Sequence, residues 1–134
     1  MYLIDTNVLS EARRGSREAQ HWLRSVDPNT IYLSVVTLGE IVKGIVLKQR
    51  TDPRGAAPLL QWLEQLRNEH GDRILPITDI IALKWGRLAA ERPRAMADAL
   101  IAATAAVHQK TIVTRNTVDF EDIPIPVINP WQAL

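Results

Sequence analysis

Four acidic residues are the first candidates for chemistry in this 134-residue chain: Asp5, Glu40, Asp98 and Asp119. Asp5 follows an apolar run at residues 2–4 that is typical of a buried strand. Glu40 and Asp98 lie in the first turns of predicted helices, and Asp119 follows a predicted strand. In a parallel sheet, the ends of strands and the beginnings of the helices beside them share one edge. We therefore expect the four carboxylates to lie close together.

Several carboxylates in one pocket need either protons or a cation. Two of them about 4 Å apart repel by roughly 4 kcal/mol at an effective dielectric near 20. The sequence has no cysteine, and the separation of His21, His70 and His108 does not indicate a zinc site. Oxygen ligands alone favour Mg²⁺ or Mn²⁺, and such a site can direct a water at a phosphodiester. The expected reaction class is metal-assisted hydrolysis.

The two acids nearest the amino terminus each have a structural alternative. Asp5 could simply accept backbone N–H groups of the helix that follows it, where Thr6 and Asn7 are typical of a helix start. Glu40 completes the pattern Thr37-x-x-Glu40, which is a capping box for a helix that opens at Thr37. The argument for a shared site therefore depends on all four acids together.

The other two acids have alternatives of the same kind. Asp98 could be a favourable charge at the amino terminus of a helix. Asp119 could cap a short turn, and either Glu121 or Asp122 could replace it as the fourth acid.

Polar neighbours of these acids are candidates to orient the carboxylates and metal-bound waters, although turn and cap roles explain them equally well. They are Thr6, Asn7, Ser34, Thr114 and Asn116. Basic residues that could contact phosphate, with simple surface solvation as the alternative, are Arg13, Arg14, Lys43, Lys84, Arg87 and Arg115.

Alternating strands and helices must position these residues. Strands are predicted at residues 2–4, 31–35, 73–77, 111–114 and 127–128. Helices are predicted at residues 7–13, 16–26, from 37 to a break at 51–55, from there to 71, from 79 to 91, and at 97–109. The alanine-rich last helix requires another element packed closely on it. This order predicts one α/β domain over residues 1–134, with a mainly parallel sheet and helices on both faces.

Composition narrows the class of protein. Sixteen basic and fifteen acidic residues give a net charge of +1, so a chain that gathers four acids in one pocket is basic elsewhere. That is compatible with a rim that binds phosphate or with a mixed surface. The sequence has neither a membrane-length apolar run nor a basic-then-apolar signal segment at Met1. These features predict a soluble, cytoplasmic protein.

Five sequence blocks carry a family resemblance, and in this order they span nearly the whole chain. They are YLIDTNVLS at residues 2–10, SVVTLGEI at 34–41, DALIAATA at 98–105, TRNTVDF at 114–120 and NPW at 129–131. With them the chain resembles PIN-domain ribonucleases, specifically the VapC or FitB-like toxins of bacterial type II toxin–antitoxin pairs.

The resemblance implies a single PIN-like domain, with a five-stranded parallel sheet between helices, that cleaves RNA with Mg²⁺, for which Mn²⁺ can substitute. It implies Asp5 and Asp98 as direct metal ligands, completed by Glu40 and Asp119. Similar toxins form homodimers and are silenced by a cognate antitoxin, for which the helices at residues 37–67 offer apolar surface. One departure is the stretch from residue 90 to residue 98, which is shorter than the corresponding loop of many such proteins.

Two other phosphate-handling families fit less well. A phosphatase of the haloacid-dehalogenase type needs a second aspartate two residues after the first, where this chain has Asn7. A receiver domain needs a late lysine, where only the segment at residues 129–131 follows the last strand. A non-catalytic α/β domain whose acidic pocket binds metal or a partner remains open as the alternative function.

Overall fold

The computed structural model describes residues 1–132, and the last two residues of the predicted domain, 133–134, lie outside that range. Its centre is a five-stranded sheet with the order β3-β2-β1-β4-β5, in which every neighbouring pair is parallel. The strands are β1 (Tyr2–Ile4), β2 (Ile31–Ser34), β3 (Ile74–Leu75), β4 (Thr111–Val113) and β5 (Val127–Ile128). The predicted parallel sheet is therefore confirmed, and β1 is its central strand.

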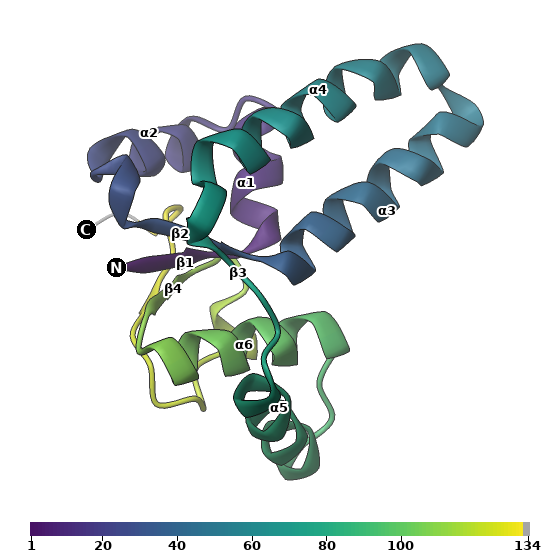
Figure 1. Ribbon diagram of the computed structural model, residues 1–134. Coiled ribbons are helices and arrows are strands. Elements are labelled where there is room, and N and C mark those ends of the chain that lie inside the picture. Colours follow the sequence, from purple (N-terminus) through teal and green to yellow (C-terminus); the bar gives the residue numbers. More distant parts are fainter. Residues whose placement is uncertain (133–134) are drawn as a thin grey trace.

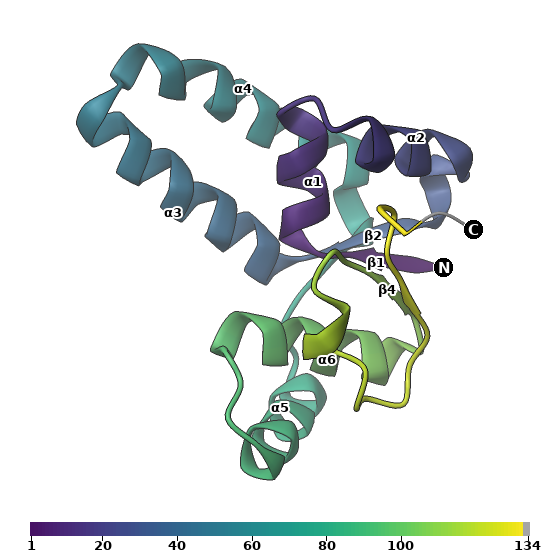
Figure 2. The same ribbon diagram turned by 180° about the vertical axis from the view of Figure 1, so that it is seen from behind.

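Helices cover both faces of this sheet, as predicted (Figure 1). They are α1 (Thr6–Arg13), α2 (Arg17–Ser25), α3 (Val35–Thr51), α4 (Pro53–His70), α5 (Asp79–Glu91) and α6 (Met96–His108). The first four helices lie on one face and the last two on the other, which the reverse view also shows (Figure 2). No helix within residues 1–132 is long and apolar enough to cross a membrane.

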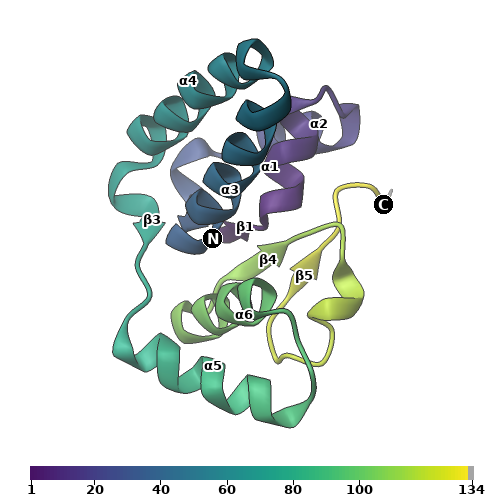
Figure 3. The ribbon, with the colours of Figure 1, turned by 90° about the vertical axis from the view of Figure 1, so that its right-hand side faces the viewer.

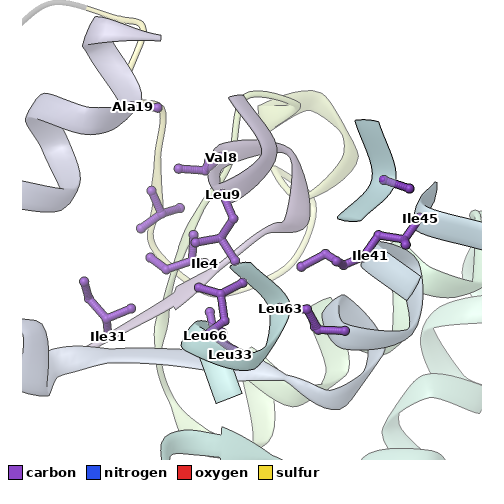
Figure 4. Close-up of a cluster of buried hydrophobic side chains, with 12 residues drawn as sticks. Ile4, Val8, Leu9, Ala19, Ile31, Leu33, Ile41, Ile45, Leu63 and Leu66 are labelled. Carbon is purple, nitrogen blue, oxygen red and sulfur yellow. The ribbon is translucent and has the colours of Figure 1, made fainter. Parts of the chain in front are cut away.

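The alternation of side chains along the strands produces two hydrophobic cores. Ile4 packs with α1, α3 and α4 on one face, and several of these side chains are shown in Figure 4. Its neighbour Leu3 points to the opposite face and packs with α5 and α6. Both side chains are fully buried, so β1 is anchored on both sides. The residue that follows β1 is thereby fixed in position.

Helices α3 and α4 form a hairpin that projects beyond the sheet (Figure 1). The predicted break at residues 51–55 is reduced to Asp52, which ends α3 and caps α4 by accepting a hydrogen bond from the Gly55 N–H at 3.0 Å. Pro53 can begin α4 because the first residue of a helix needs no N–H partner. The predicted stop of α4 is confirmed, since Gly71 follows it with a positive φ of 48°.

Three of the strands are shorter than predicted, and the one predicted at residues 111–114 ends at Val113. The strand at residues 73–77 is limited to Ile74–Leu75 because Pro76 has no N–H to continue the ladder. The strand at residues 31–35 ends at Ser34, whose side chain accepts the N–H of Val36 at 3.0 Å and so caps α3. Strand β5 lies at the sheet edge beside β4, as predicted (Figure 3).

Helix α6 packs closely on its neighbours, as its alanine content predicted. Ala99, Ala102, Ala103 and Ala105 are each at most 1% exposed, and α5 lies against this helix (Figure 3). It begins and ends one residue earlier than the predicted 97–109, and its carboxyl end lies at His108 because Gln109 adopts a left-handed conformation. Close packing of α6 against the sheet sets the position of its first turn.

This packing predicts that a larger side chain inside α6 destabilises the protein. We expect Ala103→Leu, at a fully buried position, to lower the free energy of unfolding by about 1–3 kcal/mol. Ala82→Leu makes the same change at an exposed position on α5 and is expected to have little effect. Urea denaturation of both variants is the measurement, and equal stability of the two would contradict the packing argument.

Candidate active site

Asp5 lies at the end of the central strand and caps α1. Its side chain is only 4% exposed, and both carboxylate oxygens accept hydrogen bonds. Oδ1 accepts the N–H of Thr6 at 2.8 Å, and Oδ2 accepts the hydroxyl of Thr114 at 2.8 Å and the amide of Asn7 at 3.2 Å. Asp5 therefore has the capping role of the structural alternative, but it is also bonded to the end of the neighbouring strand β4. This links it to a second segment of the site.

Glu40 does not form the predicted capping box. Because Ser34 caps α3, the helix begins at Val35, so Thr37 lies inside it and Glu40 lies in its second turn. The Thr6 hydroxyl donates to Oε1 of Glu40 at 2.6 Å, and the fully buried Thr37 hydroxyl lies 3.1 Å from Oγ1 of Thr6. A hydroxyl has one hydrogen, so Thr37 is the donor to Thr6 in this chain of bonds. The network points Glu40 toward the helix that follows Asp5.

Asp98 and Asp119 reach the same edge from the other side of the sheet. Asp98 is the third residue of α6, and Ala95, which precedes this helix, provides no side-chain cap. Asp119 ends a short 3-10 turn, Thr117–Asp119, which follows β4. The pKa of Asp98 is raised by its burial, and next by the charges of Asp119 and Glu40. The charges of two other predicted acids therefore reach Asp98.

The pKa of Asp5 is raised by the same causes. Burial raises its pKa to about 6, the hydrogen bond from Thr114 opposes that rise, and the charges of Asp98 and Glu40 add to it. The structure thus brings the four acids together at one edge, as the sequence predicted. Within residues 1–132, no three acidic or histidine side chains are close enough to enclose a metal ion unaided. A cation here would have to keep some of its water.

Asp122 is engaged outside this group. It forms forked ion pairs with Arg92, at 3.0 and 3.1 Å, and with Arg94, at 2.6 and 3.2 Å. These guanidinium groups hold the pKa of Asp122 well below its usual range. Glu121 is exposed. Of the three late acids, Asp119 is the one whose charge raises the pKa of Asp98.

The predicted polar neighbours differ in how they meet the site. Thr114 is fully buried, and its hydroxyl bonds Asp5 and accepts the backbone N–H of Asn116 at 3.0 Å. Asn7 bonds Asp5 and also accepts the N–H of Arg115 at 3.2 Å. Asn116 thus contributes its backbone to this network. Ser34 caps α3 instead, as already described.

Only some of the predicted basic residues lie beside the acids. A groove of about 450 Å³ between α1 and the α3–α4 hairpin is lined by Thr6 and Glu40 together with Arg13, Arg14 and Lys48. Lys48 was not predicted. The Arg115 guanidinium lies over the Trp131 ring, 4.7 Å from its centre. Lys84 lines a separate cavity with Gln109, and the remaining two basic candidates, Lys43 and Arg87, are exposed.

Three further residues of the site were not identified from the sequence. Thr37 was assigned to a helix cap, although it belongs to the network of Glu40. Arg92 and Arg94 pair with Asp122 across about thirty residues of sequence, and no local pattern signals such a contact.

Comparisons with known proteins agree with this arrangement. The family model of the PIN domain matches residues 2–126. The VapC ribonuclease Y4jK of Sinorhizobium fredii is 30% identical to this chain, over 98% of the chain and 99% of that protein.

Solved structures agree as well. The crystal structure of FitAcB from Neisseria gonorrhoeae superimposes with a TM-score of 0.90 at 33% identity, over 99% of this chain and 100% of that one. A toxin–antitoxin complex from Klebsiella pneumoniae gives a TM-score of 0.72 at 30% identity, over 99% and 100% of the two chains. The resemblance seen in the sequence is confirmed, and the chain belongs to the PIN-domain family.

Proposed function

We propose that this protein is a metal-dependent endoribonuclease that acts as the toxin of a toxin–antitoxin pair. The observation that carries the proposal is the buried carboxylate of Asp5, which shares one edge of the sheet with three other acids. The charges that raise the pKa values of Asp5 and Asp98 are all carboxylates. A cation stabilises a site of this kind because it offsets the repulsion between neighbouring carboxylates. The ribonuclease and toxin names of its relatives support the substrate and the role.

The donor atoms fit Mg²⁺, for which Mn²⁺ can substitute. We assign Asp5 and Asp98 as direct ligands, with Glu40 and Asp119 acting directly or through water. Among residues 1–132, Oδ1 of Asp5 accepts a single hydrogen bond, from the Thr6 N–H, so it retains a lone pair for a cation. Mg²⁺ bound by one or two carboxylates keeps several waters and often contacts phosphate. When bound, it would acidify a water and stabilise the charge on the leaving oxygen.

The residues of the chain would set the geometry of hydrolysis. Thr114 and Asn7 fix the rotation of the Asp5 carboxylate, and Thr6 fixes that of Glu40. Carboxylates held in this way can orient a water against a phosphodiester and accept its proton. We assign Glu40 to this role, with Asp119 as the further acid whose charge acts on Asp98.

We further propose that the protein forms a homodimer, works in the cytoplasm and is silenced by a cognate antitoxin. The α3–α4 hairpin exposes Val42, Val46, Leu47 and Leu60, and α5 exposes Ile80 and Leu83. Exposed apolar groups of this kind favour protein contacts. The toxin–antitoxin complex among the similar structures supports an antitoxin partner.

The first test of this function is the change Asp98→Asn. With Mg²⁺ and a structured RNA pool, we expect wild-type protein to cleave and the variant to lose roughly a hundredfold or more in rate, because a proposed metal ligand is neutralised. EDTA should abolish wild-type cleavage.

Asp79→Asn is the matched control for that test, because it also neutralises an acid in the first turn of a helix, but on the exposed start of α5. It should cleave as the wild type does. Metal binding by wild-type protein without any cleavage would instead favour the non-catalytic alternative. Equal cleavage by wild type and Asp98→Asn would remove Asp98 from the site.

The second test uses the raised pKa of Asp5. Folding lifts this pKa from 3.8 to about 6, so the native state holds the proton longer than the unfolded chain does. Stability of the metal-free protein should therefore fall as the pH rises from about 4 through 6. Asp98 shifts in the same direction. Relative to Asp5→Asn, wild-type protein should lose about 3 kcal/mol over this range.

Urea denaturation in EDTA across the pH range measures this difference. Adding Mg²⁺ at neutral pH should restore stability to the wild type more than to Asp5→Asn, because the cation offsets the buried charge. A difference between the two proteins that stays constant with pH would show that ionised Asp5 does not strain the fold.

A further inference from the structure

Two arginines in the connection between α5 and α6 bind one carboxylate. Arg92 and Arg94 each form two hydrogen bonds to the Asp122 carboxylate. These ion pairs connect residues 92–95 to the segment that follows the Thr117–Asp119 turn. Arg92 also donates from Nη2 to the backbone carbonyl of Asp119 at 3.2 Å. This cluster therefore lies directly beside the acidic edge of the sheet.

The two arginines have different environments. The Arg94 side chain is 3% exposed and fully committed, since it also donates to the Leu88 carbonyl at 2.9 Å and lies 3.5 Å from Glu91. The Arg92 side chain is 40% exposed. Its Nε and Nη2 atoms are bonded, while Nη1 makes no hydrogen bond to any residue in the range 1–132. Arg94 is an anchor, and Arg92 retains donors that a ligand can use.

Arg92 faces a small cavity that it shares with the site. The cavity has a volume of about 150 Å³, and Asp98 and Asp119 line it together with both arginines and Ala95. The amino terminus of α6 also meets this cavity, and Ala95 gives it no side-chain cap. Uncapped N–H groups at a helix start favour an anion. The cavity therefore combines two kinds of group. Asp98 and Asp119 are assigned to a cation, whereas the guanidinium and these N–H groups favour an anion beside it.

We propose that Arg92 contacts a non-bridging phosphate oxygen of the RNA substrate, and that Asp122, anchored by Arg94, positions it to do so. The inference rests on the proposed function. A guanidinium held through Nε and Nη2 by protein oxygens is already ordered while its Nη1 can still donate, which lowers the entropy lost when it binds phosphate. Arg92 is thus a substrate-binding residue, and Asp122 and Arg94 are positioning residues.

The test is RNA binding without turnover. Fluorescence anisotropy with a labelled single-stranded RNA, in an Asp5→Asn background with Mg²⁺, measures affinity over a series of salt concentrations. We expect Arg92→Gln to weaken binding about tenfold, as for one lost charge-assisted hydrogen bond. The slope of log affinity against log salt should fall by about 0.7, as for one lost phosphate contact.

Two further variants in the same background separate binding from structure. Asp122→Asn breaks both forked ion pairs but keeps the charge of Arg92, so affinity should fall while the salt slope is retained. Arg67→Gln removes an arginine that is paired with Glu64 on the exposed face of α4, and should change neither quantity.

The outcomes distinguish this inference from the proposed function. If Arg92→Gln keeps the salt slope, or if Asp122→Asn loses as much slope as Arg92→Gln, Arg92 acts only through the structure and the inference is overturned. Wild-type cleavage of RNA with an unchanged KM in Arg92→Gln would leave the nuclease intact and remove only this contact. Absence of both RNA binding and wild-type cleavage would overturn both.

Discussion

The Asp5 carboxylate is almost completely buried, so the fold must supply the hydrogen bonds that water would otherwise give it. It does so from three positions: the first N–H of α1, the amide of Asn7, and the hydroxyl of Thr114 at the end of the next strand. The first two bonds are local to the start of α1, whereas the bond from Thr114 forms only if β1 and β4 are adjacent, parallel and in register, as they are. The raised pKa near 6 shows that they compensate the burial only in part. The remaining free energy is what a cation would recover.

Much of the fold could be predicted because its signals are local. The apolar run before Asp5, the glycine that ends α4 and the alanines of α6 each indicate their element within a few residues of sequence. The predicted start of α3 at Thr37 was wrong. Ser34 and Thr37 are equally good caps by residue type, and only the position at which β2 ends decides between them. Tertiary placement of the strand selected Ser34.

The site was predictable where parallel topology alone determines proximity. Asp5, Asp98 and Asp119 needed only the rule that strand ends and helix starts share an edge. The contacts that orient them could not be predicted in the same way, because Thr37 and Asp122 act through partners that are distant in sequence. When a side chain has several possible partners, the partner that it contacts is decided only when the elements pack together.

The short connection between α5 and α6 explains how Asp98 reaches the edge without a long loop. Residues 92–95 line one cavity with Asp98 and Asp119, and the start of α6 is fixed by contacts from outside this connection. The ion pairs to Asp122 do this, because they join the connection to the turn that carries Asp119. One cluster therefore sets the relative positions of two acids that come from different elements. In this short connection, the residues that position Asp98 also place the guanidinium of Arg92 beside it.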